Sequence, residues 1–399
     1  MTTITNAPVE QWAKDYTGPK FHALLSDPPY ELAFGGNKWD ATGIAFNPDT
    51  WRALSTHLFP GAFIMVFASS VGWHRLAVAI EDAGFTLHPT IFNWVRAGGW
   101  PKSVSMGDPD FEGHRYGRQA LKPAVEPIIV AQKPYELPAL ASIKQTGAGA
   151  LNVDAARIPD EQGELKATFG GVKGQLDGGF KKSVAYQYNP HPDGRYPANF
   201  TLQHLPECER ICADTCPVKR FSESDQTEDA GRFFLRAGWA LDIEERLYDA
   251  DAVKYAHRPR TAERDAGVGN EYEKENNGFW KGLAVGGTGL PYAGLKRNNH
   301  PTVKPLELTS WLAKLLLPPD KYAPRRLLVP FCGTFSEGLG GLIAGFEEVH
   351  GVEMEAEFAQ IGRQRAAWWE QALAVSESQD VGVIKAKGDE AELYQGRLI

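Results

Sequence analysis

The chain has 399 residues, of which 43% are apolar and 23% charged, and its 42 basic and 50 acidic side chains give a formal net charge of -8. These values exclude a uniformly basic nucleic-acid-binding protein, so any nucleic-acid site must be a local basic surface. Four cysteines in a chain of this length exclude a disulfide scaffold. The sequence has no run of ~18 apolar residues and no secretory signal at its N-terminus, so we expect a cytoplasmic protein.

The first region, residues 1–150, alternates segments typical of strands and helices. Strands are predicted over 21–27, 61–69, 87–97 and 124–134. Helices are predicted over 47–59, after an Asn-Pro-Asp start, and over 72–85, ending near Gly84. Such alternation predicts an α/β fold with a largely parallel sheet covered on both faces.

The middle region, residues 151–292, has a different character. It is rich in glycine and polar residues, and strand or helix periodicity is weak. We expect an inserted, loop-rich region that carries a binding function.

Regular patterns return in residues 293–399. Helices are predicted over 305–319 and 336–346, and a strand runs into a tight turn over 325–333. Residues 347–373 predict a strand followed by a long helix, and 381–399 one more short strand. The sequence therefore predicts two α/β parts that are separated by the insert.

The segment Asp27-Pro28-Pro29-Tyr30 follows the first predicted strand. Two adjacent prolines continue neither a helix nor a central strand, so the chain must leave the sheet stiffly at this point. The Asp27 carboxylate and the Pro28 carbonyl can accept hydrogen bonds from one exocyclic amine, and the Tyr30 ring can stack on a planar base. A plain strand-ending turn remains the alternative.

A second motif covers residues 327–338 and reaches Glu353 after one helix and one strand. A glycine-containing turn between strand and helix lets the backbone approach a ligand, and an acid at the end of the second strand can bind ribose hydroxyls. This pattern predicts a nucleoside-cofactor site, with an ordinary βαβ unit as the alternative.

Three segments together resemble the signature motifs of the amino-methylating DNA methyltransferases, which use S-adenosylmethionine: residues 27–30, 300–305 and 330–333. Their order, catalytic motif first, is similar to that of the permuted β class, whose target-recognition region lies between the two halves. Further segments, including "GGWPKSV", "ALKPAVEPIIVAQKP" and "YPANF", resemble an adenine-specific subgroup carried by phages and prophages. The resemblance implies a Rossmann-like methyltransferase domain with a mostly parallel, seven-stranded type of sheet.

The same resemblance implies roles for individual residues. Asp27, Pro28, Pro29 and Tyr30 take the catalytic positions, and Glu353 takes the ribose position. The cofactor would contact Asp27, Thr302, Lys304, Pro330, Phe331, Cys332, Gly333, Thr334, Glu337 and Glu353. Cys332 is expected to be a small packing residue, because direct transfer to an amine needs no cysteine nucleophile.

The cofactor turn departs from the commoner family pattern at two positions. Val329 replaces an acid, which leaves the amino group of the methionine moiety without its usual carboxylate, and Phe335 replaces a glycine and is expected to crowd the turn. We hypothesise that Glu337, at the start of the following helix, supplies the missing charge.

The insert contains two further candidate sites. His204, Cys208, Cys212 and Cys216 occur at equal spacings of four residues. They predict either a structural zinc site that staples the insert or a set of buried or free thiols. Basic residues near the catalytic motifs predict contacts to DNA phosphates; these are Lys254, Arg258, Arg260, Arg264, Lys296 and Arg297.

The resemblance implies methylation of adenine N6 in double-stranded DNA, by a protein of a bacterial or phage-infected cell. Residues 1–150 and 293–399 would form the catalytic and cofactor-binding halves, and 151–292 the target-recognition insert. N4 methylation of cytosine, methylation of a protein glutamine, and a DNA-binding protein that has lost catalysis remain alternatives. The target sequence, a restriction partner, and the choice between monomer and homodimer stay open.

Overall fold

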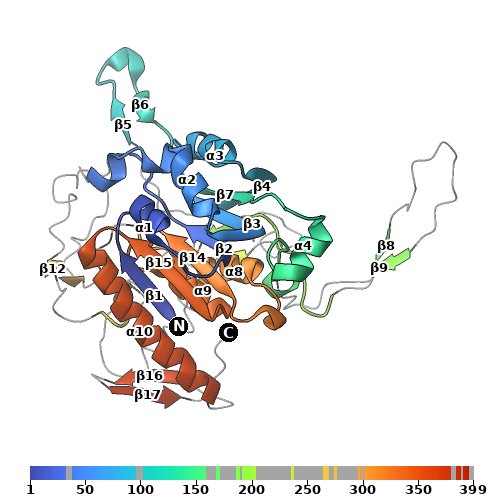
Figure 1. Cartoon of the computed structure of the whole chain (residues 1–399). Helices are drawn as coiled ribbons and strands as arrows, with labels where there is room; N and C mark the ends of the chain where they lie inside the picture. Colours follow the sequence, from blue (N-terminus) through green and yellow to red (C-terminus); the bar gives the residue numbers. More distant parts are fainter. Residues whose placement is uncertain are drawn as a thin grey trace, which may run out of the picture.

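The computed structural model describes residues 1–32, 38–95, 102–158, 191–203, 264–268, 298, 300 and 302–378, with short strands in between and beyond. Nine of the described strands form one sheet, and helices cover both of its faces (Figure 1). In spatial order the strands are β1 (Thr2–Asn6), β15 (Glu348–Glu353), β14 (Arg326–Pro330), β2 (Phe21–Ser26), β3 (Leu58–Phe67), β7 (Val125–Gln132), β4 (Thr86–Val95), β10 (Phe200–Gln203) and β11 (Leu235–Ala237).

The sheet is mostly parallel, and this confirms the predicted α/β fold class. Neighbouring strands pair in parallel throughout, except that β7 runs antiparallel to both β3 and β4. Strands from both ends of the sequence alternate in this one sheet, since β14 and β15 lie between β1 and β2. The two strands β10 and β11, from the predicted insert, extend it beyond β4.

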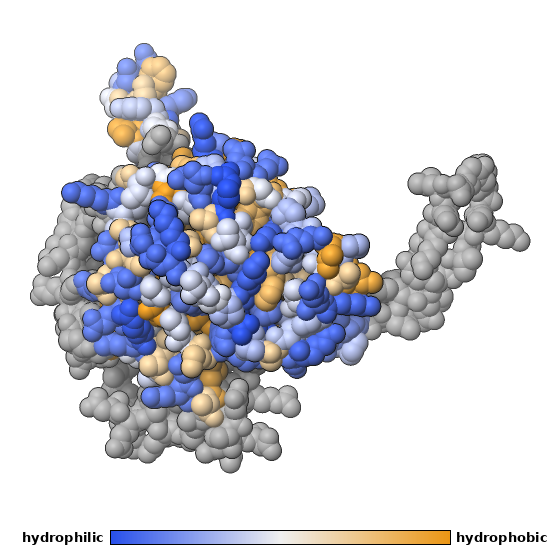
Figure 2. Space-filling view, in the orientation of Figure 1, coloured by the Kyte–Doolittle hydropathy of each residue, from blue (hydrophilic) through white to orange (hydrophobic). Residues whose placement is uncertain are grey.

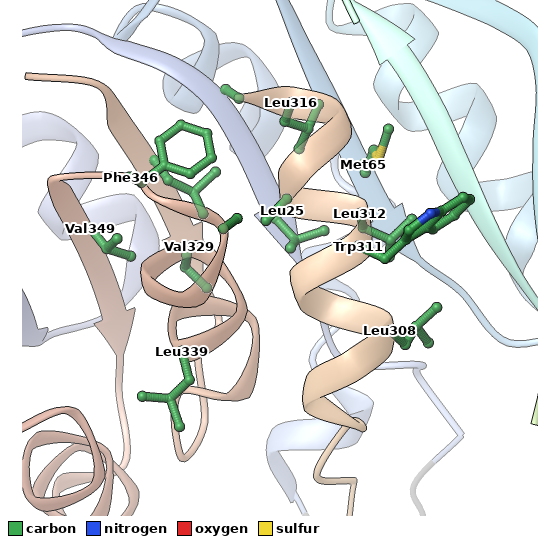
Figure 3. Close-up of a cluster of buried hydrophobic side chains, with 14 of the residues drawn as sticks. Leu25, Met65, Leu308, Trp311, Leu312, Leu316, Val329, Leu339, Phe346 and Val349 are labelled. Carbon is green, nitrogen blue, oxygen red and sulfur yellow. The ribbon is translucent and has the colours of Figure 1, made fainter. Parts of the chain in front are cut away.

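Two apolar layers sandwich the sheet because its central strands are buried on both faces. One layer contains α8 (Leu306–Leu316), α9 (Ser336–Ala344) and α10 (Ala356–Ser378), and the other α1 (Val9–Asp15), α2 (Pro48–Ser55) and α3 (Trp73–Asp82). Alternate residues of β2 face opposite layers: Leu25 packs with the first, as Figure 3 shows, and Leu24 with the second.

Local sequence signals explain where the helices begin and end. The Asn47 side chain accepts a hydrogen bond from the backbone N–H of Asp49 at 3.0 Å and caps the N-terminus of α2. Helix α2 ends at Ser55, and β3 starts three residues later, at Leu58. Helix α3 ends at Asp82, just before Gly84, whose φ of +98° suits glycine.

Several described elements were not predicted from the sequence. They include the edge strand β1, helices α1 and α4 (Ala139–Thr146), and a hairpin of β5 (Lys102–Ser105) and β6 (Arg115–Gln119). Residues 381–399, expected to hold one strand, contain the paired strands β16 (Val383–Lys387) and β17 (Glu390–Tyr394). Other short strands are β8 (Thr168–Gly170), β9 (Tyr186–Tyr188), β12 (Lys274–Glu275) and β13 (Leu295–Lys296).

The β5–β6 hairpin protrudes from the body of the molecule (Figure 1) and carries apolar side chains into solvent, as the orange atoms at the top of Figure 2 show. The exposed ones are Val104, Met106, Phe111 and Tyr116. No helix in the described part of the chain is both long and apolar enough to cross a bilayer.

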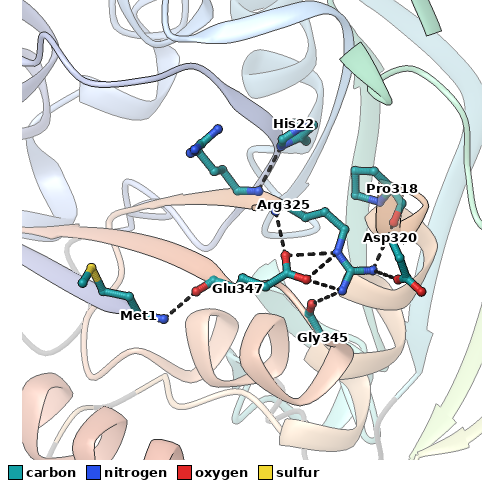
Figure 4. Close-up of polar contacts among 8 residues, drawn as sticks. Met1, His22, Pro318, Asp320, Arg325, Gly345 and Glu347 are labelled. Atoms are coloured by element: carbon teal, nitrogen blue, oxygen red, sulfur yellow. Dashed lines mark hydrogen bonds and ion pairs between the residues drawn. The ribbon is translucent and has the colours of Figure 1, made fainter. Parts of the chain in front are cut away.

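The beginnings of β14 and β15 are tied together by polar contacts around Arg325 (Figure 4). Its guanidinium donates to the Glu347 carboxylate, to Asp320 Oδ1 at 2.5 Å and to the Gly345 carbonyl at 2.8 Å. The next backbone N–H, that of Arg326, donates to His22 Nδ1 at 2.9 Å. These contacts lie at the amino ends of parallel strands. They therefore stabilise the end of the sheet opposite to the candidate site, which lies at the carboxyl ends.

Candidate functional site at the carboxyl ends of β2 and β14

The chain turns in opposite directions after β14 and after β2, which are neighbours in the sheet. From β14 it continues through α9 to β15, and from β2 through α2 to β3, on the other side. Such a switch point in an α/β sheet is where ligands bind, at the carboxyl ends of the strands. Asp27 directly follows β2, and the Ser26 hydroxyl donates to the Pro330 carbonyl at 2.8 Å. Two of the predicted motifs therefore meet here.

Asp27 is paired with Lys304, which belongs to the third motif. The Lys304 ammonium donates to Asp27 Oδ2, and the two side chains are only 3% and 8% exposed. The other carboxylate oxygen, Asp27 Oδ1, is buried and makes no hydrogen bond with the described residues. Burial raises the pKa of Asp27, Lys304 lowers it, Glu126 raises it and Tyr30 lowers it, with a net upward shift. A buried carboxylate with one uncommitted oxygen is suited to accept a hydrogen bond from a ligand.

The Tyr30 side chain has contacts at its hydroxyl and at the face of its ring. Its hydroxyl donates to Glu126 Oε2 at 3.0 Å, and the Lys304 ammonium lies 5.3 Å from the centre of its ring. The backbone N–H of the next residue, Glu31, donates to Asp40 Oδ1 at 3.0 Å. These contacts fix the orientation of the ring that was predicted to stack on a base.

The turn after β14 bends in the left-handed region at three residues. Phe331, Gly333 and Phe335 have φ values of +56°, +49° and +72°. The Cys332 N–H donates to the Val352 carbonyl at 3.0 Å, which ties the turn to β15. The Cys332 side chain is buried in the core, as expected for a packing residue, and burial raises its thiol pKa well above the ordinary value.

Phe335 does not crowd the turn as the sequence led us to expect. Its ring is fully buried in the core beneath the turn. Glycines make room for it, because an added Cβ at Gly338 or Gly351 would come within 2.2 or 2.7 Å of the ring, and one at Gly362 within 3.3 Å of the Phe335 Cβ. The substitution of phenylalanine for glycine therefore costs about 1–2 kcal/mol of backbone strain and gains a buried aromatic ring.

Glu353 closes the turn from the end of β15. Its Oε2 accepts the Gly333 N–H and its Oε1 the Glu355 N–H, both at 2.8 Å. Burial raises its pKa, against these two hydrogen bonds. Each carboxylate oxygen has a second lone pair, so Glu353 can still accept from a ribose hydroxyl.

The segment around His300 lies against the turn. A Cβ on Gly333 would come within 2.8 Å of His300 Nε2, so only glycine fits there. The Asn298 side chain donates to Thr334 Oγ1 at 3.0 Å, and the Arg264 guanidinium donates to the carbonyls of Asn298 and His300 at 3.1 and 2.5 Å. The third motif is thereby fastened to the second.

His300 is a half-buried ring in this segment. Its burial, with the nearby charges of Arg264, Lys304 and Arg365, lowers the pKa of His300 to about 3. Its ring stacks 6.2 Å from that of Trp39 and meets Phe358 edge-on at 4.6 Å. It is therefore neutral at physiological pH and acts as a packing and positioning group. Thr302, two residues on, donates its N–H to His300 Nδ1 at 3.3 Å.

Arg365, from α10, reaches the same turn from below and is completely buried. Its Nη1 donates to the Thr334 carbonyl at 2.5 Å and to Ser336 Oγ at 3.2 Å. It holds the residues that lead from the turn into α9.

Glu337 lies in the first turn of α9 and is 4% exposed, whereas Val329 at the end of β14 is fully buried. The pKa of Glu337 is raised to about 7, first by burial and then by the charge of Asp27, against the opposing effects of Lys304 and Arg365. Asp27, Lys304 and Glu337 thus form one electrostatic cluster, which we call the Asp27–Lys304–Glu337 cluster.

Much of the predicted DNA and metal sites lies outside the described residues. This holds for Lys254, Arg258, Arg260 and Arg297 and for the proposed zinc ligands His204, Cys208, Cys212 and Cys216. Lys296 is described only as part of β13, and the Arg264 guanidinium binds the backbone carbonyls named above. Among the described residues no three His, Cys, Asp or Glu side chains are grouped as metal ligands.

Three positioning residues were not assigned from the sequence. Glu126 had a visible signal, since a carboxylate in the otherwise apolar run of β7 requires a partner. Asn298 lies two residues before the third motif, but no role was assigned to it from the sequence. Arg365 had no signal, because a charged residue in a long helix is normally exposed.

No protein-family model matches the chain, and no curated protein matches its sequence. Several solved structures do match. The M1.HpyAVI–SAM complex is 14% identical with a TM-score of 0.39, and the match covers 92% of this chain and 99% of that one. A putative DNA modification methylase from Thermus thermophilus, complexed with S-adenosyl-L-methionine, is 12% identical with a TM-score of 0.39, covering 92% and 94%. PvuII DNA methyltransferase (cytosine-N4-specific) is 10% identical with a TM-score of 0.43, and the match covers 93% of this chain and 92% of that one. With TM-scores below 0.5, these likenesses carry no weight for the function of this chain.

Proposed function

We propose that the protein is a DNA methyltransferase that transfers a methyl group from S-adenosylmethionine to the exocyclic amino group of a base, with adenine N6 as the target. The observation that carries this proposal is the convergence of three sequence motifs at the switch point between β2 and β14. Asp27, Lys304 and the 330–335 turn meet there although they are distant in the sequence.

The residues around the turn fit a nucleoside cofactor. Gly333 lets the backbone come close to a ligand, and Glu353 offers acceptors at the end of β15. Phe331, Cys332, Thr334 and Pro330 shape the remainder of the turn. Asp27 Oδ1, buried and without a hydrogen-bond partner among the described residues, marks where the reacting groups would meet. S-adenosylmethionine, when bound, supplies a methyl group on an electrophilic sulfonium.

The chemistry assigned to the protein is positioning and electrostatic stabilisation. Asp27 Oδ1 and the Pro28 carbonyl would accept the two N–H groups of the amine, and this moves its lone pair out of conjugation with the ring. Tyr30 would stack on the flipped base, with Pro29 fixing the chain between them. With the methyl group transferred to the amine nitrogen, Asp27 would take up the proton that the nitrogen loses. Lys304 opposes the upward shift of the Asp27 pKa and so favours the carboxylate form before the transfer.

N4 methylation of cytosine is the second candidate, because cytosine presents the same exocyclic amine to the same acceptors. We place adenine first on the resemblance of residues 27–30 and of the further segments to the adenine-specific subgroup. Glutamine methylation and a purely DNA-binding role are weaker: the large insert suits DNA recognition, and the uncommitted Asp27 oxygen suits catalysis.

The test is incubation of the protein with S-adenosylmethionine and unmethylated duplex DNA, followed by digestion to nucleosides and mass spectrometry. We expect N6-methyladenosine in its deoxy form. The appearance of N4-methylcytosine would replace adenine by cytosine, and cofactor binding without any DNA methylation would refute the enzymatic proposal.

A further inference from the structure

Asp27, Lys304 and Glu337 bring an unbalanced charge into the interior. Lys304 and Glu337 are 3% and 4% exposed, and the Asp27 side chain 8%. Two carboxylates face one ammonium group, so the fully ionised cluster carries one net negative charge. A buried uncompensated charge is costly, and a protein relieves it by binding a proton or a cation.

We propose that the Asp27–Lys304–Glu337 cluster exchanges a proton for a cation: the cofactor-free protein holds a proton on Glu337, and the ammonium of an α-amino acid group displaces it. This inference rests on the proposed function, because the methionine end of S-adenosylmethionine is the source of that ammonium.

Burial raises the pKa of both carboxyl groups, but the contact with Lys304 assigns the proton to Glu337 and not to Asp27. Lys304 is in direct contact with Asp27, and this contact stabilises the Asp27 carboxylate. Glu337 feels Lys304 only at longer range, and Asp27 repels it. The cation nearest to it on α10, Arg365, is already bound to Thr334 and Ser336.

Two independent features of the site point to a bound cation. Asp27 Oδ1 is buried and has no hydrogen-bond partner among the described residues, and its two lone pairs allow it to accept from the base amine and from a bound ammonium. Val329 places no carboxylate near the end of β14, and Glu337 is a buried acid in the first turn of the following helix. Glu353, the other acid at the turn, is occupied by two backbone N–H groups.

Two titratable groups near Glu337, His300 and Cys332, stay neutral in the relevant pH range. The pKa of His300, lowered to about 3 by burial and nearby cations, keeps that ring neutral. The pKa of the Cys332 thiol is raised well above its usual value by burial and by Glu353 and Glu337. Glu126 faces Asp27 from β7 and adds negative charge, which favours the same proton.

The pH dependence follows from linkage. With a pKa of about 7 in the free protein, Glu337 is protonated at pH 5.5 and half protonated at pH 7. If a neighbouring ammonium lowers this pKa below ~5, binding releases about one proton at pH 5.5 and about half a proton at pH 7. Affinity then rises roughly fifteenfold between these two pH values.

Isothermal titration calorimetry in two buffers of different ionisation enthalpy counts the released protons. S-adenosylmethionine and S-adenosylhomocysteine both carry the ammonium and should both release the proton. 5′-Methylthioadenosine, which lacks the amino acid, should bind with no release. Equal release by all three ligands, or release by S-adenosylmethionine alone, would overturn the assignment to the ammonium.

The variant Glu337→Gln should abolish the proton release and flatten the pH dependence between pH 5.5 and 7. The exposed Glu81→Gln on α3 is the matched control and should behave as the wild type. Should Glu337→Gln fail to fold, the ligand comparison on the wild-type protein still decides. Tight cofactor binding with DNA methylation but without proton release would refute only this inference, whereas absence of cofactor binding would refute the proposed function itself.

Discussion

The ammonium of Lys304 is paired with the carboxylate of Asp27, although 277 residues separate them in the sequence. This contact joins the strand end that carries the catalytic motif to the segment that precedes α8. It also offsets the negative charge of one of the buried carboxylates at the site. The pair therefore links the stability of the fold to the state of the candidate active site.

Replacing Lys304 by methionine should destabilise the protein in a pH-dependent way. Removing one member of a buried pair leaves an uncompensated charge and costs about 3–5 kcal/mol. The pKa of Asp27 is already raised by burial. Without Lys304 it rises further, so the destabilisation is full at pH 8 and shrinks towards pH 5 as the carboxylates take up protons. Urea unfolding at several pH values measures this. Lys14→Met, an exposed position on α1, is the control, and an equal effect at pH 5 and pH 8 would contradict the expectation.

Two variants at Tyr30 can separate the contribution of ring stacking from that of the hydroxyl hydrogen bond. Tyr30→Phe keeps the ring and loses the hydroxyl contact to Glu126, so we expect a loss of activity of about 2- to 10-fold. Tyr30→Ala also removes the stacking platform, worth about 1–3 kcal/mol per base, and should lower the single-turnover methylation rate by a further 10-fold or more. Binding of S-adenosylmethionine should change little in either variant. Equal rates for the two variants would show that the ring does not contact the base.

A substitution at Gly333 tests whether the turn must approach His300 closely. Gly333→Ala combines a left-handed φ of +49° with a Cβ only 2.8 Å from His300 Nε2, so it should lower stability by about 2–4 kcal/mol and weaken cofactor binding. Gly84→Ala is the matched control, because its φ is +98° but no atom lies within 4 Å of the new Cβ. That variant should cost about 1–2 kcal/mol and leave cofactor binding unchanged. Thermal melts and calorimetry compare them; a Gly333→Ala protein that binds as the wild type would contradict the role of this turn.

Phe335 and Gly338 form a pair that a double-mutant cycle can test. Alanine normally favours a helix over glycine by about 1 kcal/mol. Gly338→Ala should nevertheless destabilise the protein by about 1–3 kcal/mol, because the new Cβ would lie 2.2 Å from the Phe335 ring. In a Phe335→Ala background the same substitution should become neutral or stabilising. Additive effects in denaturant unfolding would show that the ring does not occupy this place.

The sequence predicted the central elements well because their signals are local. The apolar run of β3 and the capped start of α2 are specified by neighbouring residues, and the structure confirms both. Strand β1 was missed because its five residues, three threonines among them, become a strand only by pairing with β15, more than 340 residues away. Pairing partners at that distance leave no local pattern.

The candidate site shows the same division. The residue types at 27–30 and 330–333 indicated their chemistry, and the structure brings the two segments together at the carboxyl ends of β2 and β14. Phe335 was expected to crowd the turn, and this was wrong because the glycines at 338, 351 and 362 that accommodate its side chain are recognisable only in three dimensions. The buried role of Arg365 was invisible for the same reason.

The most direct test of the central claim is a single-turnover transfer of labelled methyl from S-adenosylmethionine to duplex DNA, comparing the wild type with Asp27→Asn. The amide leaves the size of the side chain unchanged, and cofactor binding, measured in parallel, should persist. We predict label on the exocyclic nitrogen of adenine with the wild type and a loss of at least about 100-fold with the variant. Transfer by Asp27→Asn at the wild-type rate, or no transfer by a wild-type protein that binds the cofactor, would contradict the account.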